Sequence, residues 1–411
     1  MNLWIGRPGA LREITDGAAE FDRSPDLGVQ EFRSLGGGVT TWAPPTAPRR
    51  LSLSWEAMQA DDAYHLDRLA RRVDGPGPIH VIDPGSDNWL APSIGAGRIS
   101  LADYSEWVAD PTIIFHPAPL DYDVMRVSLQ ATSGNRRIVF RRPDGSAYPV
   151  APGMRVAWWV PGMVGALSEL RIYTYTSAKQ AASVGSFGAG PANVDRPFLF
   201  TIPEGVTHIA PVMWFSKLFA DLPMSGAYLR QARPEDSTAR TTMRQAFNAA
   251  VQAGTAPVTA YTAGTGVTLS VSGGKAMLTS TGVAGSALSF GTAKTHAVSA
   301  GEIVSLTHAV PGAVTPVLVW TDSEGATVGQ SRDTLIGRVP DGAAYVWPKV
   351  ELGAVATAAA IGAVSLEITS GPATPPGEGT RPYSITGYSV TPAPGRVRER
   401  DVSLELVEVT E

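Results

Sequence analysis

The chain has 411 residues, no cysteine and a formal net charge of −5, and only 17% of its residues are charged. The lack of cysteine excludes disulfide frameworks, thiolate zinc sites and cysteine nucleophiles. The negative charge, without any lysine- or arginine-rich block, argues against nucleic-acid binding. The 43 glycines and 33 prolines favour many short strands, and the length predicts about two to four domains.

The chain begins with a short strand, Leu3 to Ile5, and a polar stretch that ends in Gly36-Gly37-Gly38. No Gly-Lys-Ser/Thr follows the glycines, so we interpret them as a flexible hairpin or an inter-subunit arm rather than a phosphate loop. The first residues lack the pattern of a secretory signal, which predicts synthesis in the cytoplasm. No apolar run approaches the ~20 residues of a membrane span.

The stretch from Arg49 to Leu90 carries the strongest pattern. Leu51, Leu53 and Trp55 alternate with polar residues, which predicts a half-buried strand. An amphipathic helix follows, for which Asp61 or Asp62 is expected to be the cap. A Gly/Pro segment ends the helix, and a second strand then covers residues 79–83.

This order of elements resembles the amino-terminal domain of distal tail proteins and related minor tail proteins of long-tailed bacteriophages, particularly those of actinobacterial hosts. The matching features are Arg50, Leu51-x-Leu53-x-Trp55, the acidic helix, the Gly/Pro break, Val81-Ile82-Asp83-Pro84 and Asn88-x-Leu90. The resemblance implies a ring-forming subunit at the tail tip of the virion, with a hexamer favoured. It also implies contacts with a tail tube protein and tail-tip hub proteins. We assign residues 1–118 to this ring domain.

Residues 119–253 are predicted to form a first antiparallel β-sandwich, because short apolar strands alternate with turns such as Asp144-Gly145. The expected strands are Val124 to Ala131, Arg137 to Arg141, Met154 to Val160, Leu170 to Thr176, Pro197 to Ile202 and His208 to Phe215. Ser237 to Ala253 is predicted to be a linking helix.

Residues 254–378 repeat this plan. Residues 150–162 align with residues 298–312, and residues 202–211 align with residues 339–348, which predicts a duplicated sandwich. Both halves resemble jelly-roll or galectin-like sandwiches of the carbohydrate-binding-module kind. Residues 379–411 are expected to form a connector and a carboxy-terminal strand, Arg400 to Val409, that returns to the first domain.

One polar and aromatic set in the first sandwich is a candidate site. By strand alternation, Arg171, Tyr173 and Tyr175 face away from Leu170 and Ile172. In the predicted strand from Met154 to Val160, Trp159 points away from the face shared by Val156, Trp158 and Val160. If the aliphatic sides form the core, these four residues line an outer surface that binds glycan or forms a subunit interface.

No catalytic or metal site is predicted. The six histidines show no metal-ligand spacing, and no Gly-x-Ser-x-Gly elbow is present. Asp322 and Glu324 are predicted to be turn residues, and the alternative for such carboxylates is a glycosidase acid pair in a β-sandwich. We therefore expect no cofactor and no enzymatic activity.

Together these features predict a mainly-β protein. It would have an amino-terminal α+β or β-barrel tail-ring domain and two inserted or appended antiparallel β-sandwich domains. The expected function is a structural component of a phage tail tip or baseplate, a ring between tube and tip whose peripheral domains contact host-surface glycans. The alternatives are a free-standing carbohydrate-binding-module protein and, less favoured, a β-sandwich glycoside-active enzyme.

Overall fold

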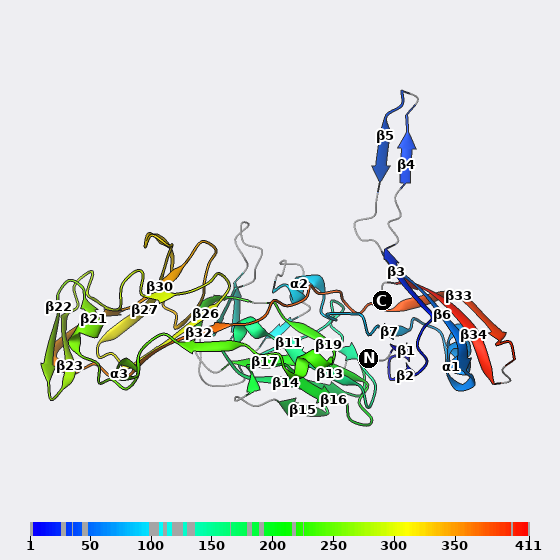
Figure 1. Ribbon diagram of the computed structural model, residues 1–411, viewed down its shortest axis with the longest axis horizontal. Helices are drawn as coiled ribbons and strands as arrows, with labels where there is room; N and C mark the ends of the chain where they lie inside the picture. The colour runs from blue at the N-terminus through cyan, green and yellow to red at the C-terminus, as the bar shows by residue number, and fades with distance from the viewer. Residues whose placement is uncertain are drawn as a thin grey trace.

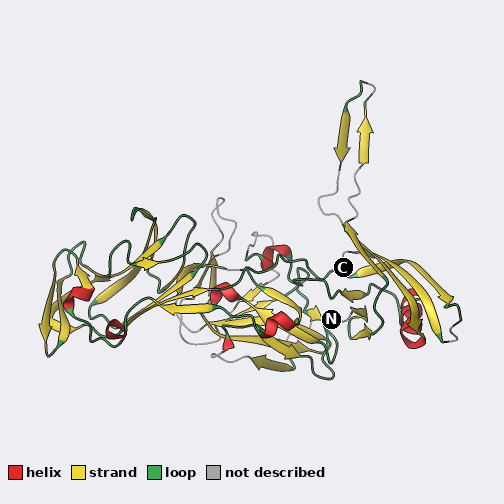
Figure 2. Cartoon of the chain, in the orientation of Figure 1, coloured by secondary structure: helices red, strands yellow, loops and turns green. Residues whose placement is uncertain are grey.

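The computed structural model describes residues 3–25, 30–34, 36–42, 48–97, 107–109, 113–116, 126–129, 136–164, 166–178, 183–188, 193–215, 219–224, 226–395 and 398–409. The chain forms an elongated row of three units, with an amino-terminal unit at one end and two β-sandwiches beside it (Figure 1). Strands dominate all three units, and helices are few and short (Figure 2). The protein is therefore mainly β, built from antiparallel sheets. In this described part, no helix is long and apolar enough to cross a membrane.

The amino-terminal unit contains strands from both ends of the chain. A three-stranded sheet has the order β2-β1-β7, and a four-stranded sheet has the order β3-β6-β34-β33. Helix α1 packs on the second sheet, against β6, β33 and β34. The elements are β1 (Leu3–Arg7), β2 (Ala10–Ile14), β3 (Glu20–Pro25), β6 (Arg49–Gln59), α1 (Ala60–Ala70), β7 (His80–Ile82), β33 (Tyr383–Pro392) and β34 (Glu399–Glu408).

The alternation in β6 supplies the core of this unit. Leu51, Leu53 and Trp55 are buried, and across the sheet they face apolar residues of β34. The expected helix cap is wrong, because α1 has no side-chain cap. Asp62 instead accepts hydrogen bonds from the backbone and hydroxyl of Thr15, at 3.1 and 3.0 Å. This carboxylate therefore ties the helix to the chain that follows β2.

A hairpin projects away from the amino-terminal unit (Figure 1). It consists of β4 (Gln30–Arg33) and β5 (Val39–Trp42), which pair only with each other among the described strands. Every residue of both strands is exposed. We call this hairpin the arm; it forms beside the triple glycine, where Gly37 has a φ of 82°.

The first sandwich is made of three sheets, in the orders β18-β10-β9, β15-β14-β17-β11-β8 and β16-β13-β19, with β12 also paired to β17. Its elements are α2 (Pro92–Gly95), β8 (Trp107–Ala109), β9 (Ile113–His116), β10 (Arg126–Leu129), β11 (Arg137–Phe140), β12 (Tyr148–Pro149), β13 (Arg155–Trp159), β14 (Leu167–Tyr175), β15 (Gly185–Gly188), β16 (Phe198–Thr201), β17 (His208–Phe215), β18 (Phe219–Pro223) and β19 (Tyr228–Gln231), with 3-10 turns Pro161–Met163 and Pro234–Ser237.

The second sandwich repeats this topology and has one additional strand, β20, at the edge of its third sheet. Its sheets have the orders β22-β23-β31, β28-β27-β30-β24-β21 and β29-β26-β32-β20, with β25 also paired to β30. Its elements are β20 (Thr242–Gln245), α3 (Ala249–Gln252), β21 (Tyr261–Ala263), β22 (Val267–Ser272), β23 (Lys275–Thr281), β24 (Ala287–Phe290), β25 (His296–Ala297), β26 (Ile303–His308), β27 (Ala313–Thr321), β28 (Thr327–Arg332), β29 (Ile336–Arg338), β30 (Tyr345–Leu352), β31 (Ala354–Ala360) and β32 (Val364–Ser370), with a 3-10 turn Val258–Ala260.

The two aligned sequence segments form the same hydrogen bonds in both sandwiches. Gly153 donates to Ile202 at 2.9 Å, and Gly301 donates to Val339 at the same distance. Both glycines have a φ above 80°, a conformation that suits glycine. The repeated sequence pattern therefore marks a repeated strand and turn geometry.

Strand pairing corrects several sequence-based boundaries. β8 and β9 lie before residue 119, yet they pair with β11 and β10 of the first sandwich. β20 lies before residue 254, yet it pairs with β32 of the second. The predicted helix from Ser237 to Ala253 is wrong: Asn248 caps only the four-residue α3.

The segment after the second sandwich runs back along the first one. Glu378 and Gly379 donate backbone hydrogen bonds to the carbonyls of Asn88 and Leu90, each at 2.9 Å. The chain then enters β33, which lies within the expected connector, and the turn to β34 follows. β34 pairs with β6 over most of its length, so the carboxy-terminal strand lies in the amino-terminal sheet.

Candidate functional site

The outward face of the first sandwich carries a row of arginines and aromatic rings on β11, β14 and β17. The opposite face of the same strands, with Leu170 and Ile172, belongs to the main core. Tyr173 and Tyr175 lie on the outward side in a separate apolar cluster. The alternation expected in β14 is therefore present, and it separates the aliphatic residues from the predicted site residues. We call the outward row the arginine–aromatic face.

Each ring on this face lies under a guanidinium. Arg137 is 5.4 Å from the centre of the Tyr173 ring, and Arg141 is 4.8 Å from that of Tyr175. Each arginine also donates to the hydroxyl of the tyrosine beneath it, at 2.5 and 2.9 Å. Burial raises the pKa of Tyr175, so this hydroxyl stays protonated at neutral pH. Stacking and hydrogen bonding together fix the positions of both guanidiniums.

Trp214 joins the row from the central strand. Arg171 lies 4.5 Å from the centre of its ring, and Arg137 lies 5.9 Å from it. Arg171 also forms an ion pair with Glu169 at 2.7 Å. Gly188 of β15 makes room for this carboxylate, because a Cβ at that position would lie 1.7 Å from Glu169 Oε1. Arg171 is thus partly neutralised by a neighbour on its own strand.

Arg137 and Arg141 differ from Arg171 in their charge environment. Within the residues that the structure describes, neither guanidinium forms an ion pair with a carboxylate. Both side chains are partly exposed. The face therefore carries positive charge on a protein whose net charge is −5.

Trp159 does not belong to this face, and its expected exposure is wrong. The side chain is completely buried, and its indole donates to the carbonyl of Val194 at 3.1 Å. The ring also meets Tyr228 edge to face, with centroids 6.3 Å apart. Alternation correctly turns Trp159 away from Trp158, but β13 is the middle strand of its sheet and is covered on both sides.

Arg137, Arg141 and Trp214 are members of the site that the sequence pattern did not predict. The signal was present, since all three occupy alternating outward positions of predicted strands. The pairing of β11 with β17 places Arg137 opposite Trp214. Only this register, which the sequence does not give, brings them together with Tyr173.

The second sandwich has a different outward face. Ala287 lies opposite Glu351 there, in the place where Arg137 lies opposite Trp214. Glu351 forms a 2.5 Å ion pair with Arg332, and Lys349 lies 3.3 Å from the centre of the Trp347 ring. The arginine–aromatic face is therefore not repeated with the fold.

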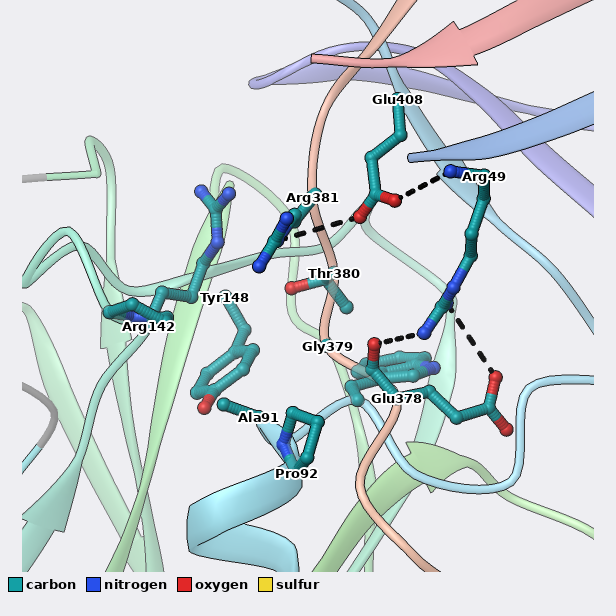
Figure 3. A pocket seen from close by; sticks show the side chains of 12 residues that line it. Arg49, Ala91, Pro92, Arg142, Tyr148, Glu378, Gly379, Thr380, Arg381 and Glu408 are labelled. Atoms are coloured by element: carbon teal, nitrogen blue, oxygen red, sulfur yellow. Dashed lines mark hydrogen bonds and ion pairs between the residues drawn. The ribbon is translucent and has the colours of Figure 1, made fainter. Parts of the chain in front are cut away.

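A cavity of about 260 Å³ lies where the amino-terminal unit, the first sandwich and the returning segment meet (Figure 3). Glu408 accepts the backbone N–H of Arg49 at 2.9 Å and forms an ion pair with Arg381 at 3.5 Å. Arg49 also approaches Glu378 to 3.8 Å. These bonds cross between the last strand, the returning segment and β6, so they attach the returning segment to the amino-terminal unit.

A buried histidine pair belongs to the same junction. Burial, followed by the charge of Arg142, lowers the pKa of His80 to about 3 and that of His208 to about 4. Both imidazoles are therefore neutral at pH 7. Across the described ranges, no group of three or more histidine or acidic side chains is arranged to hold a metal ion.

Comparisons with known proteins give only weak structural neighbours. No protein-family profile and no curated protein matches the sequence. The tandem CBM22 domains of Xyn10C from Paenibacillus barcinonensis are 10% identical, with 80% of this chain and 99% of that chain covered and a TM-score of 0.20. The infectious bursal disease virus Gt strain structure is 12% identical, with coverages of 73% and 77% and a TM-score of 0.18.

The VP2 subviral particle of the same virus is 12% identical, with coverages of 84% and 77% and a TM-score of 0.13. Scores this low carry no argument about function. The β-sandwich architecture rests on the strand pairing itself. The likeness of the amino-terminal stretch to distal tail proteins stays a prediction.

Proposed function

We propose that the chain is a structural subunit of a bacteriophage tail tip. In this proposal the amino-terminal unit assembles with copies of itself into a ring, with a hexamer favoured, between a tail tube protein and tail-tip hub proteins. The two sandwiches lie outside the ring, where the first contacts host-surface glycan. The proposal places the protein in the virion and assigns it no reaction and no cofactor.

The exposed arm is the observation that supports assembly most directly. Phe32 is 58% exposed, and Val39 and Trp42 are each 55% exposed. A two-stranded hairpin is at best marginally stable alone in water. Each side chain is already nearly half buried, so completing its burial against a partner would contribute about 1–2 kcal/mol. The arm therefore has the character of a segment that is completed by a neighbouring subunit.

The position of the arm suits a second copy of the chain as that neighbour. The arm leaves the amino-terminal unit far from the second sandwich and points away from the row of units (Figure 1). A neighbouring amino-terminal unit can thus receive it without contact between the sandwiches. The resemblance of residues 49–90 to ring-forming tail proteins supports the same choice of partner.

The test is photo-crosslinking of the purified chain. A benzophenone amino acid replaces Trp42 in the arm, and in a control it replaces Val271, which is 62% exposed on the second sandwich. We expect a ladder of crosslinked oligomers from position 42 and monomer from position 271. Monomer alone from position 42 would overturn the assembly role of the arm.

The second candidate is a free-standing carbohydrate-binding protein, which the arginine–aromatic face favours. Such a protein would remain monomeric and still bind polysaccharide through the first sandwich. Crosslinking and binding measured on the same preparation therefore separate the two functions.

A further inference from the structure

We propose that the arginine–aromatic face of the first sandwich binds an anionic polysaccharide, one that carries a carboxylate or phosphate in its repeating unit. This inference rests on the outward glycan-binding role proposed above and specifies the chemistry of the ligand. The ligand class follows from the groups on this face that a ligand can reach.

The tyrosine rings are not available as stacking platforms for neutral sugars. Tyr173 is 7% exposed and Tyr175 is 2% exposed, because guanidiniums cover them. Stacking of a sugar requires an open ring face. The groups that a ligand meets first are therefore the outer edges of Arg137 and Arg141.

These edges are suited to anions. A guanidinium has five N–H donors and no acceptor, and its planar edge matches the two oxygens of a carboxylate or phosphate. Arg137 and Arg141 each use one N–H donor on a tyrosine hydroxyl. Their remaining donors face no carboxylate in the described part of the chain. Because stacking already fixes both side chains, binding costs little further side-chain entropy.

The arginines form a row along the sheet face, an arrangement that suits a polymer. Arg137 begins β11 and Arg141 directly follows it, so extended backbone separates their Cα atoms by roughly 13 Å. Their guanidiniums are held by Tyr173 and Tyr175 on one face of β14. Successive charged units of a polysaccharide can therefore engage the two guanidiniums in turn. Arg171, which is paired with Glu169, extends the row across β17 to β14.

A nucleic acid is a poorer fit to this face. Single-stranded nucleic acids bind where bases stack on open aromatic rings within a broadly basic groove. Here the tyrosine rings are covered, and the whole chain has a net charge of −5. The local positive charge is confined to one sheet face, which favours a sparsely charged polymer.

The test uses the full chain and three defined probes: an alginate oligosaccharide for carboxylate, a glycerol-phosphate oligomer for phosphate and a neutral β-glucan oligosaccharide. Calorimetry at 50 and 300 mM NaCl compares the wild type with Arg137→Gln/Arg141→Gln. We expect binding of at least one anionic probe, weakening at high salt and falling about tenfold or more in the double variant. Arg332→Gln, on the second sandwich, serves as the matched control and should retain wild-type affinity.

The outcomes separate this inference from the broader proposal. Binding of the neutral probe alone would overturn the anionic ligand class and leave the glycan role intact. Absence of binding to all three probes would overturn both, while the crosslinking ladder would still report on assembly. Tighter binding of a thymidine oligonucleotide than of either anionic oligosaccharide would also overturn the inference. Melting curves of each variant verify that the sandwich is folded, and Tyr173→Phe tests the positioning hydroxyl without removing a charge.

Discussion

Leu404 of β34 lies directly opposite Leu53 of β6, and each side chain is only 1% exposed. The amino-terminal unit thus buries the two ends of the chain in one sheet, and both sandwiches are inserted between them. The unit cannot complete its core until the carboxy-terminal strand is present.

Replacing Leu404 by alanine should destabilise the amino-terminal unit by about 2–4 kcal/mol, because the change removes buried methyl groups and leaves a cavity. Urea unfolding followed by hydrogen exchange of the β6 backbone amides measures the lost free energy of unfolding. Glu405→Gln is the control, since Glu405 is exposed on the other face of β34. Equal midpoints for Leu404→Ala and the wild type would mean that β34 does not contribute to this core.

Acid should loosen the junction between the amino-terminal unit and the first sandwich. The folded-state pKa values of His80 and His208, about 3 and about 4, lie below the ordinary value of 6.5. As the pH falls below 6.5, the unfolded chain binds protons that the folded chain does not. Stability present above pH 6.5 is therefore lost towards pH 4, by up to ~1.4 kcal/mol per pH unit for each histidine.

Urea unfolding at pH 7.5, 6.5, 5.5 and 4.5 measures this dependence. His208→Gln keeps a neutral polar group and should give a shallower loss of stability below pH 6.5. A slope identical to that of the wild type would rule out His208 as a source of the acid sensitivity.

Trp159 and Trp214 should respond differently to truncation. Trp159→Ala leaves a cavity at a completely buried position and should lower the free energy of unfolding by about 3–5 kcal/mol. Trp214→Ala removes a partly exposed ring and should lower the free energy of unfolding by less. The change also leaves Arg137 and Arg171 without the ring that they contact. Thermal unfolding of both variants gives the comparison; a larger loss for Trp214→Ala would reverse the assignment of core and surface.

Gly377 should be intolerant of a side chain. An added Cβ would lie 2.3 Å from the carbonyl oxygen of Ala91, so Gly377→Ala must displace the returning segment. We expect the free energy of unfolding to fall by about 1–3 kcal/mol, as at other overpacked sites. Gly36→Ala in the arm is the control, because nothing lies within 4 Å of its added Cβ. Unfolding midpoints that agree for these two variants would show that the returning segment is not packed as described.

Much of the fold follows from local patterns in the sequence. The alternation in β6 and β14 identifies these strands and the faces that they bury, and the short apolar run of β17 between turns identifies that strand. Local sequence patterns do not predict the secondary structure of a segment when that structure depends on its pairing partner. Residues 242–245 form a strand because β32 lies beside them, and Asn248 starts a helix of only four residues.

Other features depended on contacts that only the folded chain creates. β33 is flanked by prolines and glycines and has a register shift between Ile385 and Gly387, so its alternation is interrupted. The arginine–aromatic face draws residues from three strands that pair out of sequence order. The sequence shows arginines and aromatic residues on these strands, whereas the register of β11 with β17 determines that Arg137 meets Trp214.

The most direct test of the account is the solution mass of the purified chain, measured by light scattering, with negative-stain images of the same sample. Wild-type chain should give a mass several times 43.2 kDa and ring-shaped particles. Replacing Phe32 and Trp42 in the arm by serine should reduce the mass to that of one chain without lowering the unfolding temperature of the sandwiches. A wild-type mass of 43.2 kDa, unchanged in the arm variant, would contradict the proposal that this chain builds a ring.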